Sequence, residues 1–231
     1  MSFYEKTNLL IGDENLQILN NSRICIFGLG GVGSSVIESL ARAGIGSFYL
    51  YDYDKIVESN LNRQLITTVD NIGKFKIDVA KERILQINPL ANIHISLLKI
   101  SKENINLIDF CQFDYIVDAI DDVEAKILII RKAKDKNIPI VSSMGTANRI
   151  DPYKFKITDI SKTEYCPLAR KIRLALKREG IYHLDVLNSY EAPKNFVNEK
   201  KQLGTISYNI IIAGSLIAHH VINKLIAKSI L

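Results

Sequence analysis

The residues best suited to chemistry lie in a glycine-rich stretch at 28–33, which reads GLGGVG and directly follows an apolar run at 24–27. Closely spaced glycines let a backbone turn approach a phosphate group, and a helix that begins there offers free N–H groups and the positive end of its dipole. About twenty residues further on, a second apolar run ends at Asp52 and Asp54, where a carboxylate can hold ribose hydroxyl groups. The pattern predicts a nucleotide site, but NAD and ATP fit it equally well.

The segments that must position these residues alternate between strand and helix patterns. Apolar runs predict strands at 24–27, 48–51, 93–97, 115–119 and 138–143. Helical spacing predicts a lead-in helix at 3–20 and further helices from the glycine stretch to Ala43, at 74–88 and at 123–136. This alternation predicts an α/β protein with a doubly wound, mainly parallel sheet and a Rossmann-like core.

The last third of the chain has a looser pattern. We expect a single domain over 1–231, with a nucleotide-binding core at 1–150 and a C-terminal extension at 151–231. The extension is predicted to hold strands at 155–158 and 182–187, a helix from Cys166 to Gly180, and a polar loop at 191–204. The apolar run at 206–222 contains serine, asparagine and histidine, so it predicts a buried helix rather than a membrane span.

Charge is unevenly distributed along the chain. The 17 Lys/Arg and 18 Asp/Glu of residues 1–150 give −1, whereas the 13 Lys/Arg and 7 Asp/Glu of residues 151–231 give +6. Arg170, Arg173 and Lys177 lie at i, i+3 and i+7 of the predicted helix, so they are expected to share one face. This basic excess fits an anionic partner such as a nucleic acid, and it equally fits a solvated surface.

The number and spacing of the cysteines indicate the redox compartment and limit the metal sites that can be expected. Cys25, Cys111 and Cys166 are far apart and form no C-x-x-C pair, so we expect no structural zinc site of the usual spacing. Sparse, unpaired cysteines fit a reducing compartment, and the first residues lack the apolar core of a signal peptide. We therefore expect a cytoplasmic protein with no membrane association, in which Cys25 lies in the core and Cys111 packs against neighbours.

Five motifs in a fixed order carry a family resemblance. They are the glycine stretch, the Asp52 acid pair, 59–64 (SNLNRQ), 73–76 (GKFK) and 118–122 (DAIDD). Together they resemble the ATP-binding core of the ubiquitin-activating-enzyme superfamily, which includes the bacterial proteins ThiF and MoeB. Segments 9–12 (LLIG), 86–89 (QINP) and 158–163 (TDISKT) are most similar to its branch of tRNA threonylcarbamoyladenosine dehydratases, the TcdA branch. The missing C-x-x-C pairs agree with that branch.

The resemblance implies an enzyme that uses ATP and Mg²⁺ to adenylate the threonyl carboxylate of threonylcarbamoyladenosine in tRNA, followed by cyclisation with net loss of water. It also implies a homodimer, and a sulfur-transfer partner of the cysteine desulfurase type. The residues that it places around the nucleotide are Gly28, Gly30, Gly31, Gly33, Asp52, Asp54, Asn60, Arg63, Lys76 and Asp121. Among these, Arg63 and Lys76 would neutralise phosphate charge, and Asp121 would hold Mg²⁺ or cap the helix at 123–136. Arg170, Arg173 and Lys177 would hold tRNA.

Two positions leave their roles open. Lys6 stands where the superfamily usually supplies an arginine to the partner subunit's ATP, and lysine keeps the charge but loses the two-pronged geometry. Cys166 lies where thioester-forming relatives place a catalytic cysteine, and it also suits the cap of the helix that begins at Pro167. The helix cap is the interpretation we favour, because cyclisation by the substrate's own nitrogen needs no enzyme thiol.

Two other functions also fit parts of the sequence. One is adenylation of the C-terminal carboxylate of a ubiquitin-like or sulfur-carrier protein, as in ThiF and MoeB. The other is NAD-dependent hydride transfer, for which the 59–64 motif has no use.

Overall fold

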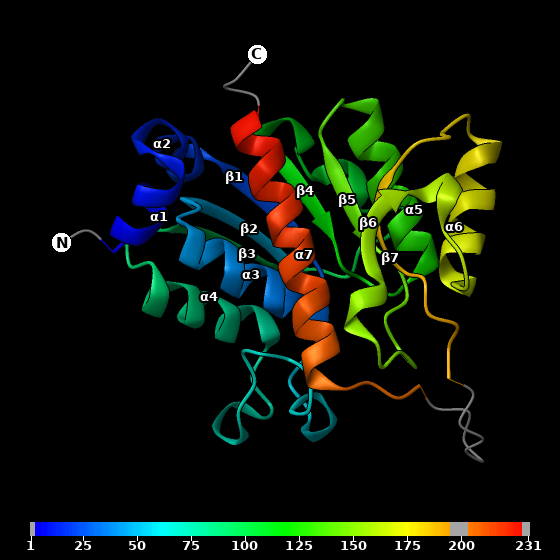
Figure 1. Ribbon diagram of the computed structural model, residues 1–231, viewed down its shortest axis with the longest axis horizontal. Helices are drawn as coiled ribbons and strands as arrows, with labels where there is room; N and C mark the ends of the chain where they lie inside the picture. The colour runs from blue at the N-terminus through cyan, green and yellow to red at the C-terminus, as the bar shows by residue number, and fades with distance from the viewer. Residues whose placement is uncertain (1–2, 195–202, 228–231) are drawn as a thin grey trace.

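The computed structural model describes residues 3–194 and 203–227. The strands are β1 (Arg23–Phe27), β2 (Ser47–Asp52), β3 (Asn92–Leu97), β4 (Tyr115–Asp118), β5 (Ile140–Ser143), β6 (Phe155–Asp159) and β7 (Asp185–Ser189). The helices are α1 (Glu5–Ile11), α2 (Asp13–Asn21), α3 (Gly31–Ala43), α4 (Lys76–Ile87), α5 (Val123–Asp135), α6 (Pro167–Arg178) and α7 (Ser207–Ile226) (Figure 1).

The strands form one sheet in the order β3-β2-β1-β4-β5-β7-β6. All neighbours are parallel except β6, which runs antiparallel to β7. The predicted α/β class and mainly parallel sheet are confirmed. The strand order reverses between β1 and β4, because β2 and β3 extend the sheet on one side and β4 on the other. Ligands in open α/β sheets bind outside the carboxyl ends of the strands at such a switch point.

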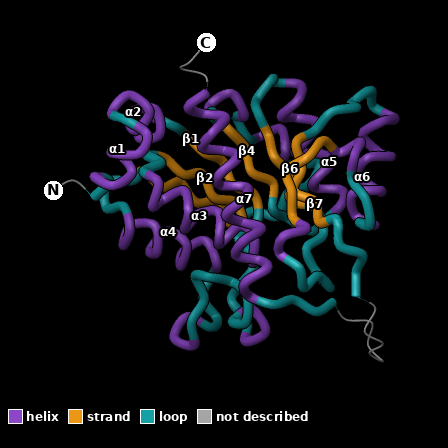
Figure 2. The backbone as a smooth tube through the Cα atoms, in the orientation of Figure 1, coloured by secondary structure: helices purple, strands orange, loops and turns teal. Residues whose placement is uncertain are grey.

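Helices cover both faces of this sheet (Figures 1 and 2). One buried cluster joins α3, α4 and α7 to one face, and a second joins α5 and α6 to the other. The central strands are therefore buried on both sides, as their continuous apolar runs require. The two C-terminal strands extend the same sheet, and α7 crosses back over it to α3.

The contact between α7 and α3 is close enough to need a glycine. A Cβ on Gly214 would lie 2.4 Å from the Ser35 Cβ, so the two helices approach almost backbone to backbone. By length and composition α7 could cross a membrane, with a mean hydropathy of 1.3. Its buried side includes Ala213, Ile217 and Val221, so one side of α7 lies in the core as predicted, while the opposite side is exposed.

The N-terminal lead-in differs from the single helix expected at 3–20. It is broken at Gly12, whose φ of 83° lies in the left-handed region, and forms α1 and α2 instead. Glycine adopts this conformation without the steric penalty that other residues suffer. Helical periodicity on both sides of Gly12 hid the break.

Candidate nucleotide site

Three connecting loops meet at the switch point of the sheet. Phe27 at the end of β1 pairs with Tyr51 of β2 on one side and with Asp118 of β4 on the other. Three motifs therefore follow the carboxyl ends of adjacent parallel strands: the glycine turn, the acid pair and the 118–122 motif. The structure brings together the motifs that the sequence separates by up to about ninety residues.

The glycine turn is shaped by its contacts with the neighbouring loop. Gly28 has φ of 88°, and a Cβ there would lie 2.8 Å from the carbonyl group of Ala119. A Cβ on Gly33 would lie 1.9 Å from the Gly28 carbonyl oxygen, so no side chain fits at either position. Gly30 is different, because a Cβ there would meet nothing within 4 Å. Gly30 is the N-cap of α3, and no side chain accepts a hydrogen bond from the first N–H groups of the helix. These N–H groups and the open space beside Gly30 are therefore available to an anion.

Asp52 fastens the glycine turn to the second strand. Its Oδ2 accepts a hydrogen bond from the Leu29 N–H at 2.7 Å, and its Oδ1 accepts one from the Asp54 N–H at 2.8 Å. The residue is 8% exposed. A carboxylate oxygen can accept more than one hydrogen bond, so ribose binding and this structural role are compatible.

Asp54 and Lys76 form an ion pair across the base of the site. The Lys76 Nζ lies 2.6 Å from the Asp54 Oδ2, and the Lys76 N–H donates to the Asp54 carbonyl at 3.0 Å. The lysine side chain is 7% exposed, whereas the aspartate side chain is 47% exposed. Lys76 is therefore not an ordinary solvated lysine on a helix face, because it is buried at the first turn of α4.

Arg63 lies against the start of α3. A Cβ on Gly31 would be 3.4 Å from the Arg63 Cγ. The Arg63 Nη1 donates to the Ser59 carbonyl at 2.6 Å and to the Asn62 Oδ1 at 3.0 Å. Its Nε and Nη2 make no hydrogen bond within the described part of the chain, so they are available to a ligand.

Asn60 builds the loop that carries Arg63. It is 7% exposed, and its Oδ1 accepts from the Val57 N–H at 3.1 Å. Its carbonyl accepts from the N–H groups of Arg63 and Gln64. The structure thus gives Asn60 a role in holding the loop, beside the phosphate contact that the resemblance implies.

The two acids after β4 have separate environments. The Asp122 Oδ1 accepts from the Ala125 N–H at 2.8 Å, so Asp122 is the cap of α5. The alternative of a cap for Asp121 is therefore wrong. Asp121 is exposed, and its carboxylate has no hydrogen-bond donor or cation within bonding distance among the described residues.

The pKa of Tyr53 reflects the negative charge at the carboxyl ends of β2 and β4. Burial raises the pKa of Tyr53, and the carboxylates of Asp54, Asp121, Asp52 and Asp122 raise it further. The acids of the β2 and β4 motifs thus share one region.

Among residues 3–194 and 203–227, no three His, Cys, Asp or Glu side chains are grouped as a metal site. Mg²⁺ does not need such a cage, because it keeps several waters and binds through one or two carboxylates and substrate phosphates. The exposed Asp121 carboxylate fits that donor set.

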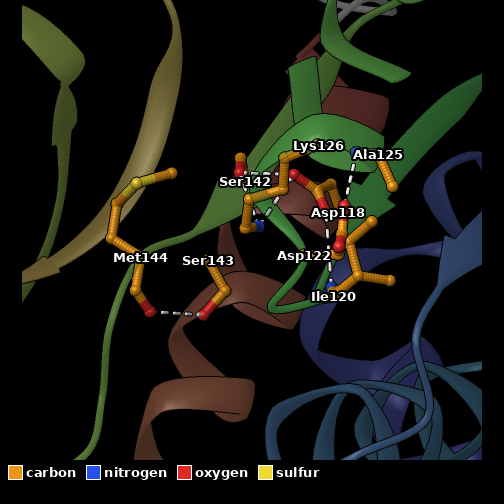
Figure 3. Close-up of polar contacts among 8 residues, drawn as sticks. All are labelled: Asp118, Ile120, Asp122, Ala125, Lys126, Ser142, Ser143 and Met144. Carbon is orange, nitrogen blue, oxygen red and sulfur yellow. Dashed lines mark hydrogen bonds and ion pairs between the residues drawn. The ribbon is translucent and has the colours of Figure 1, made fainter. Parts of the chain in front are cut away.

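A buried polar cluster behind the site was not predicted. Lys126, Asp118 and Ser142 are completely buried and bonded to one another (Figure 3). The one sequence signal was a lysine on the apolar side of the helix at 123–136. Nothing in the sequence indicated its partners.

The cysteines have different outcomes. Cys25 is buried, as predicted, whereas Cys111 is exposed, so the prediction that Cys111 packs against neighbours was wrong. The Cys166 Sγ accepts from the Ala169 N–H at 3.4 Å and from the Gly145 N–H at 3.3 Å. Cys166 is therefore the cap of α6, in agreement with the favoured interpretation.

The basic face of α6 is not uniform. Arg170 and Lys177 are exposed, as expected for an anion-binding surface. Arg173 is partly buried, and its Nη1 donates to the carbonyls of Ile160 and Thr163 at 3.3 and 3.2 Å. Arg173 therefore holds the preceding turn. Most of the predicted polar loop, at 195–202, lies outside the described residues.

Lys6 lies far from the glycine turn of its own chain. It is exposed on α1, whose neighbour Tyr4 donates from its hydroxyl to the Ala41 carbonyl at 3.3 Å. Ala41 is in the last turn of α3, whereas the glycine turn precedes the first, and a helix of this length spans about 20 Å.

Comparisons with known proteins agree with these motifs. The tRNA threonylcarbamoyladenosine dehydratase of Bacillus subtilis (strain 168) is 38% identical over 191 residues, covering 82% of this chain and 75% of that protein. The Escherichia coli (strain K12) protein of the same name is 38% identical over 173 residues, covering 75% of this chain and 65% of that protein.

Solved structures agree as well. The crystal structure of E. coli TcdA in complex with ATP superposes with a TM-score of 0.92 at 33% identity, covering 98% of this chain and 95% of that one. The complex of the same protein with AMP gives 0.91. These matches confirm the resemblance to the TcdA branch. The model of the ThiF family matches residues 4–230, and this chain belongs to the ThiF family.

Proposed function

We propose that this chain adenylates a carboxylate with ATP and Mg²⁺, and that its substrate is the threonyl carboxylate of threonylcarbamoyladenosine in tRNA. The observation that carries the proposal is that the glycine turn, the Asp52–Asp54 turn and the 118–122 loop extend from adjacent strands at the switch point. Arg63 lies against the start of α3, and Lys76 is paired with Asp54. The names of the similar dehydratases, and the ATP and AMP complexes of TcdA, support both the nucleotide and the substrate.

The reaction follows from the chemistry of carboxylates. A carboxylate is a poor electrophile, because oxide would have to leave. A carboxylate oxygen therefore attacks the α-phosphorus of ATP, and pyrophosphate leaves. A nitrogen of the same modified base then attacks the activated carbonyl carbon, AMP leaves with the carboxylate oxygen, and the nitrogen loses its proton. The net change in the nucleoside is loss of water.

The residues of the site have distinct roles in this scheme. The N–H groups at the start of α3 and the Nε and Nη2 of Arg63 receive phosphate oxygens. Lys76 neutralises the negative charge that develops on the departing pyrophosphate. Asp121 would hold Mg²⁺, and the ion would supply further positive charge to the phosphates.

The ion pair with Asp54 allows Lys76 to change its counter-ion when nucleotide binds. In the absence of nucleotide Asp54 compensates its charge, and the exposed side of Asp54 lets that carboxylate turn toward solvent. Bound phosphates replace Asp54 as the counter-ion, so the lysine is never left buried without an anion.

The proposal extends to a homodimer in which Lys6 reaches the partner's nucleotide. The opposite positions of α1 and the glycine turn along α3 exclude contact between Lys6 and its own site. Leu9 and Leu10 on α1 are 74% and 84% exposed, which is consistent with burial against a second copy. Analytical ultracentrifugation tests the dimer, and mixing Lys6→Ala with Arg63→Ala chains tests the contact in trans. Partial recovery of activity in the mixture supports it.

Charge and the resemblance support the remaining partners in the proposal. Arg170 and Lys177 supply exposed positive charge for tRNA phosphates. A tRNA substrate supports the cytoplasmic location that we propose, and a cysteine desulfurase system is the proposed sulfur-transfer partner.

Exchange of labelled pyrophosphate into ATP tests the adenylation step. We expect exchange only when tRNA that carries threonylcarbamoyladenosine is present. Exchange that requires a protein ending in Gly-Gly would instead favour activation of a carrier protein. Enhanced NADH fluorescence without ATP binding would favour hydride transfer.

A further inference from the structure

The buried cluster behind the nucleotide site joins three elements through charged and polar groups. Lys126 on α5 places its Nζ 2.9 Å from the Asp118 Oδ2 and 3.1 Å from the Ser142 Oγ. The Ser142 hydroxyl, at the end of β5, donates to the same Asp118 oxygen at 2.6 Å. Both charged side chains are 0% exposed. Figure 3 shows Lys126 and Ser142 pointing toward the Asp118 side chain.

Stability alone does not explain such a cluster. Removing two charges from water carries a large desolvation penalty, and well-packed apolar side chains of similar volume often replace a buried ion pair without loss of stability. The surroundings on α5 are apolar, since Ala125, Ile129 and Ile130 are also buried. An apolar residue at 126 would therefore suit the core.

The cluster instead fixes the loop that follows β4. The Asp118 Oδ1 accepts from the Ile120 N–H at 3.3 Å, and the Ala119 N–H donates to the Phe27 carbonyl at 2.8 Å. The Ala119 carbonyl group lies against Gly28, so a shift of this loop would displace the glycine turn. At the other end of the loop, Asp122 is fastened as the cap of α5. Asp121 is the residue between these two anchors.

We propose that Lys126 is a positioning residue, which holds Asp118 and thereby sets the position of Asp121 for Mg²⁺-ATP. The proposal rests on the proposed function for the role of Asp121. Groups behind a metal ligand commonly act in this way, and their loss typically lowers metal affinity roughly 10- to 100-fold.

The test separates positioning from stability by replacing the whole cluster with apolar groups. The variant combines Asp118→Leu, Lys126→Met and Ser142→Ala, so that no buried charge or hydroxyl is left without a partner. ATP affinity is measured by calorimetry in EDTA and again in excess Mg²⁺, and thermal unfolding is recorded in parallel. The binding measurement omits tRNA, so ATP is not consumed during it.

We expect the triple variant to fold with a midpoint close to that of the parent and to bind ATP in EDTA nearly as well. The increase in ATP affinity on addition of Mg²⁺ should fall roughly 10- to 100-fold relative to the parent. The matched control, Lys132→Met, makes the same substitution nearer the end of α5, and it should leave that increase unchanged. An unaltered Mg²⁺ effect in the folded triple variant would show that the cluster is only structural.

Lys126→Arg keeps the proposal testable if the triple variant does not fold. It retains the positive charge but changes the donor geometry, and we expect an intermediate loss of the Mg²⁺ effect with little change in affinity measured in EDTA. Full retention of the Mg²⁺ effect in Lys126→Arg, or an equal fall in both affinities, would overturn the proposal. A parent protein that binds no ATP, or gains nothing from Mg²⁺, would contradict the proposed function itself.

Discussion

Lys76 and Asp54 form an ion pair with a 2.6 Å contact in which the cation is buried and the anion is half exposed. The lysine therefore depends on an anion that a ligand can displace. Asp54→Asn should destabilise the nucleotide-free protein by about 1–2 kcal/mol, less than for a fully buried pair because Asp54 is partly solvated.

Bound ATP should restore that loss, because phosphate supplies the missing negative charge. We expect ATP to raise the unfolding midpoint of Asp54→Asn by more than it raises that of the parent. Thermal unfolding with and without ATP measures both shifts, with Asp70→Asn as the control at an exposed position. A smaller shift in Asp54→Asn than in the parent would mean that ATP does not take over the contact with Lys76.

Substitution of Asp121 and of Asp122 should distinguish the roles of these two neighbouring acids. Asp121→Ala should abolish AMP formation at all Mg²⁺ concentrations while leaving the unfolding midpoint nearly unchanged. Asp122→Ala should still form AMP at saturating Mg²⁺ and lower stability by about 1 kcal/mol, the usual effect of losing a helix cap. AMP formation across a Mg²⁺ titration, together with chemical denaturation, distinguishes them. Normal turnover in Asp121→Ala would remove this residue from the site.

Arg63 is expected to act through its planar group of donors. Arg63→Ala should lower the rate of adenylation by roughly 10²–10³, the scale of losing one preorganised contact to developing charge. Arg63→Lys should recover little, because lysine cannot reproduce the two parallel hydrogen bonds. Single-turnover AMP formation measures both. A near-normal rate for the lysine variant would count against two-pronged binding of phosphate.

The exposed charges of α6 should affect tRNA and leave ATP binding unchanged. Combining Arg170→Ala and Lys177→Ala should reduce the slope of log affinity against log salt by roughly one unit for each lost phosphate contact. Electrophoretic mobility shifts over a salt series give the slope. An identical slope would mean that α6 is an ordinary solvated face. Arg173→Ala serves as a contrast, because its hydrogen bonds to the 160–163 turn predict a loss of stability of about 1–3 kcal/mol.

The parts of the fold that follow from local patterns could be predicted from the sequence. Period and turn chemistry indicated the parallel strands and the glycine turn, because both depend on neighbouring residues. The break at Gly12 was missed, since its only signal was one glycine in a helical pattern.

The partners of buried side chains could not be predicted. Asp54 and Lys76 are 22 residues apart, and Asp118 and Ser142 are 24 apart, so only the packed sheet brings each pair together. The sequence could not show that Arg173 turns inward while Arg170 stays exposed, because both fit the same helical face. Asp121 and Asp122 are neighbours of the same type, and only the backbone path after β4 assigns the cap to Asp122.

Mass spectrometry of nucleosides is the most direct test of the proposed reaction. Modified tRNA is incubated with the protein, ATP and Mg²⁺, and its nucleosides are then analysed, with the Asp121→Ala variant as the inactive control. We expect threonylcarbamoyladenosine to lose the mass of one water molecule while AMP appears in equal amount. Unchanged threonylcarbamoyladenosine, in the presence of protein that binds ATP and Mg²⁺, would contradict the proposed function.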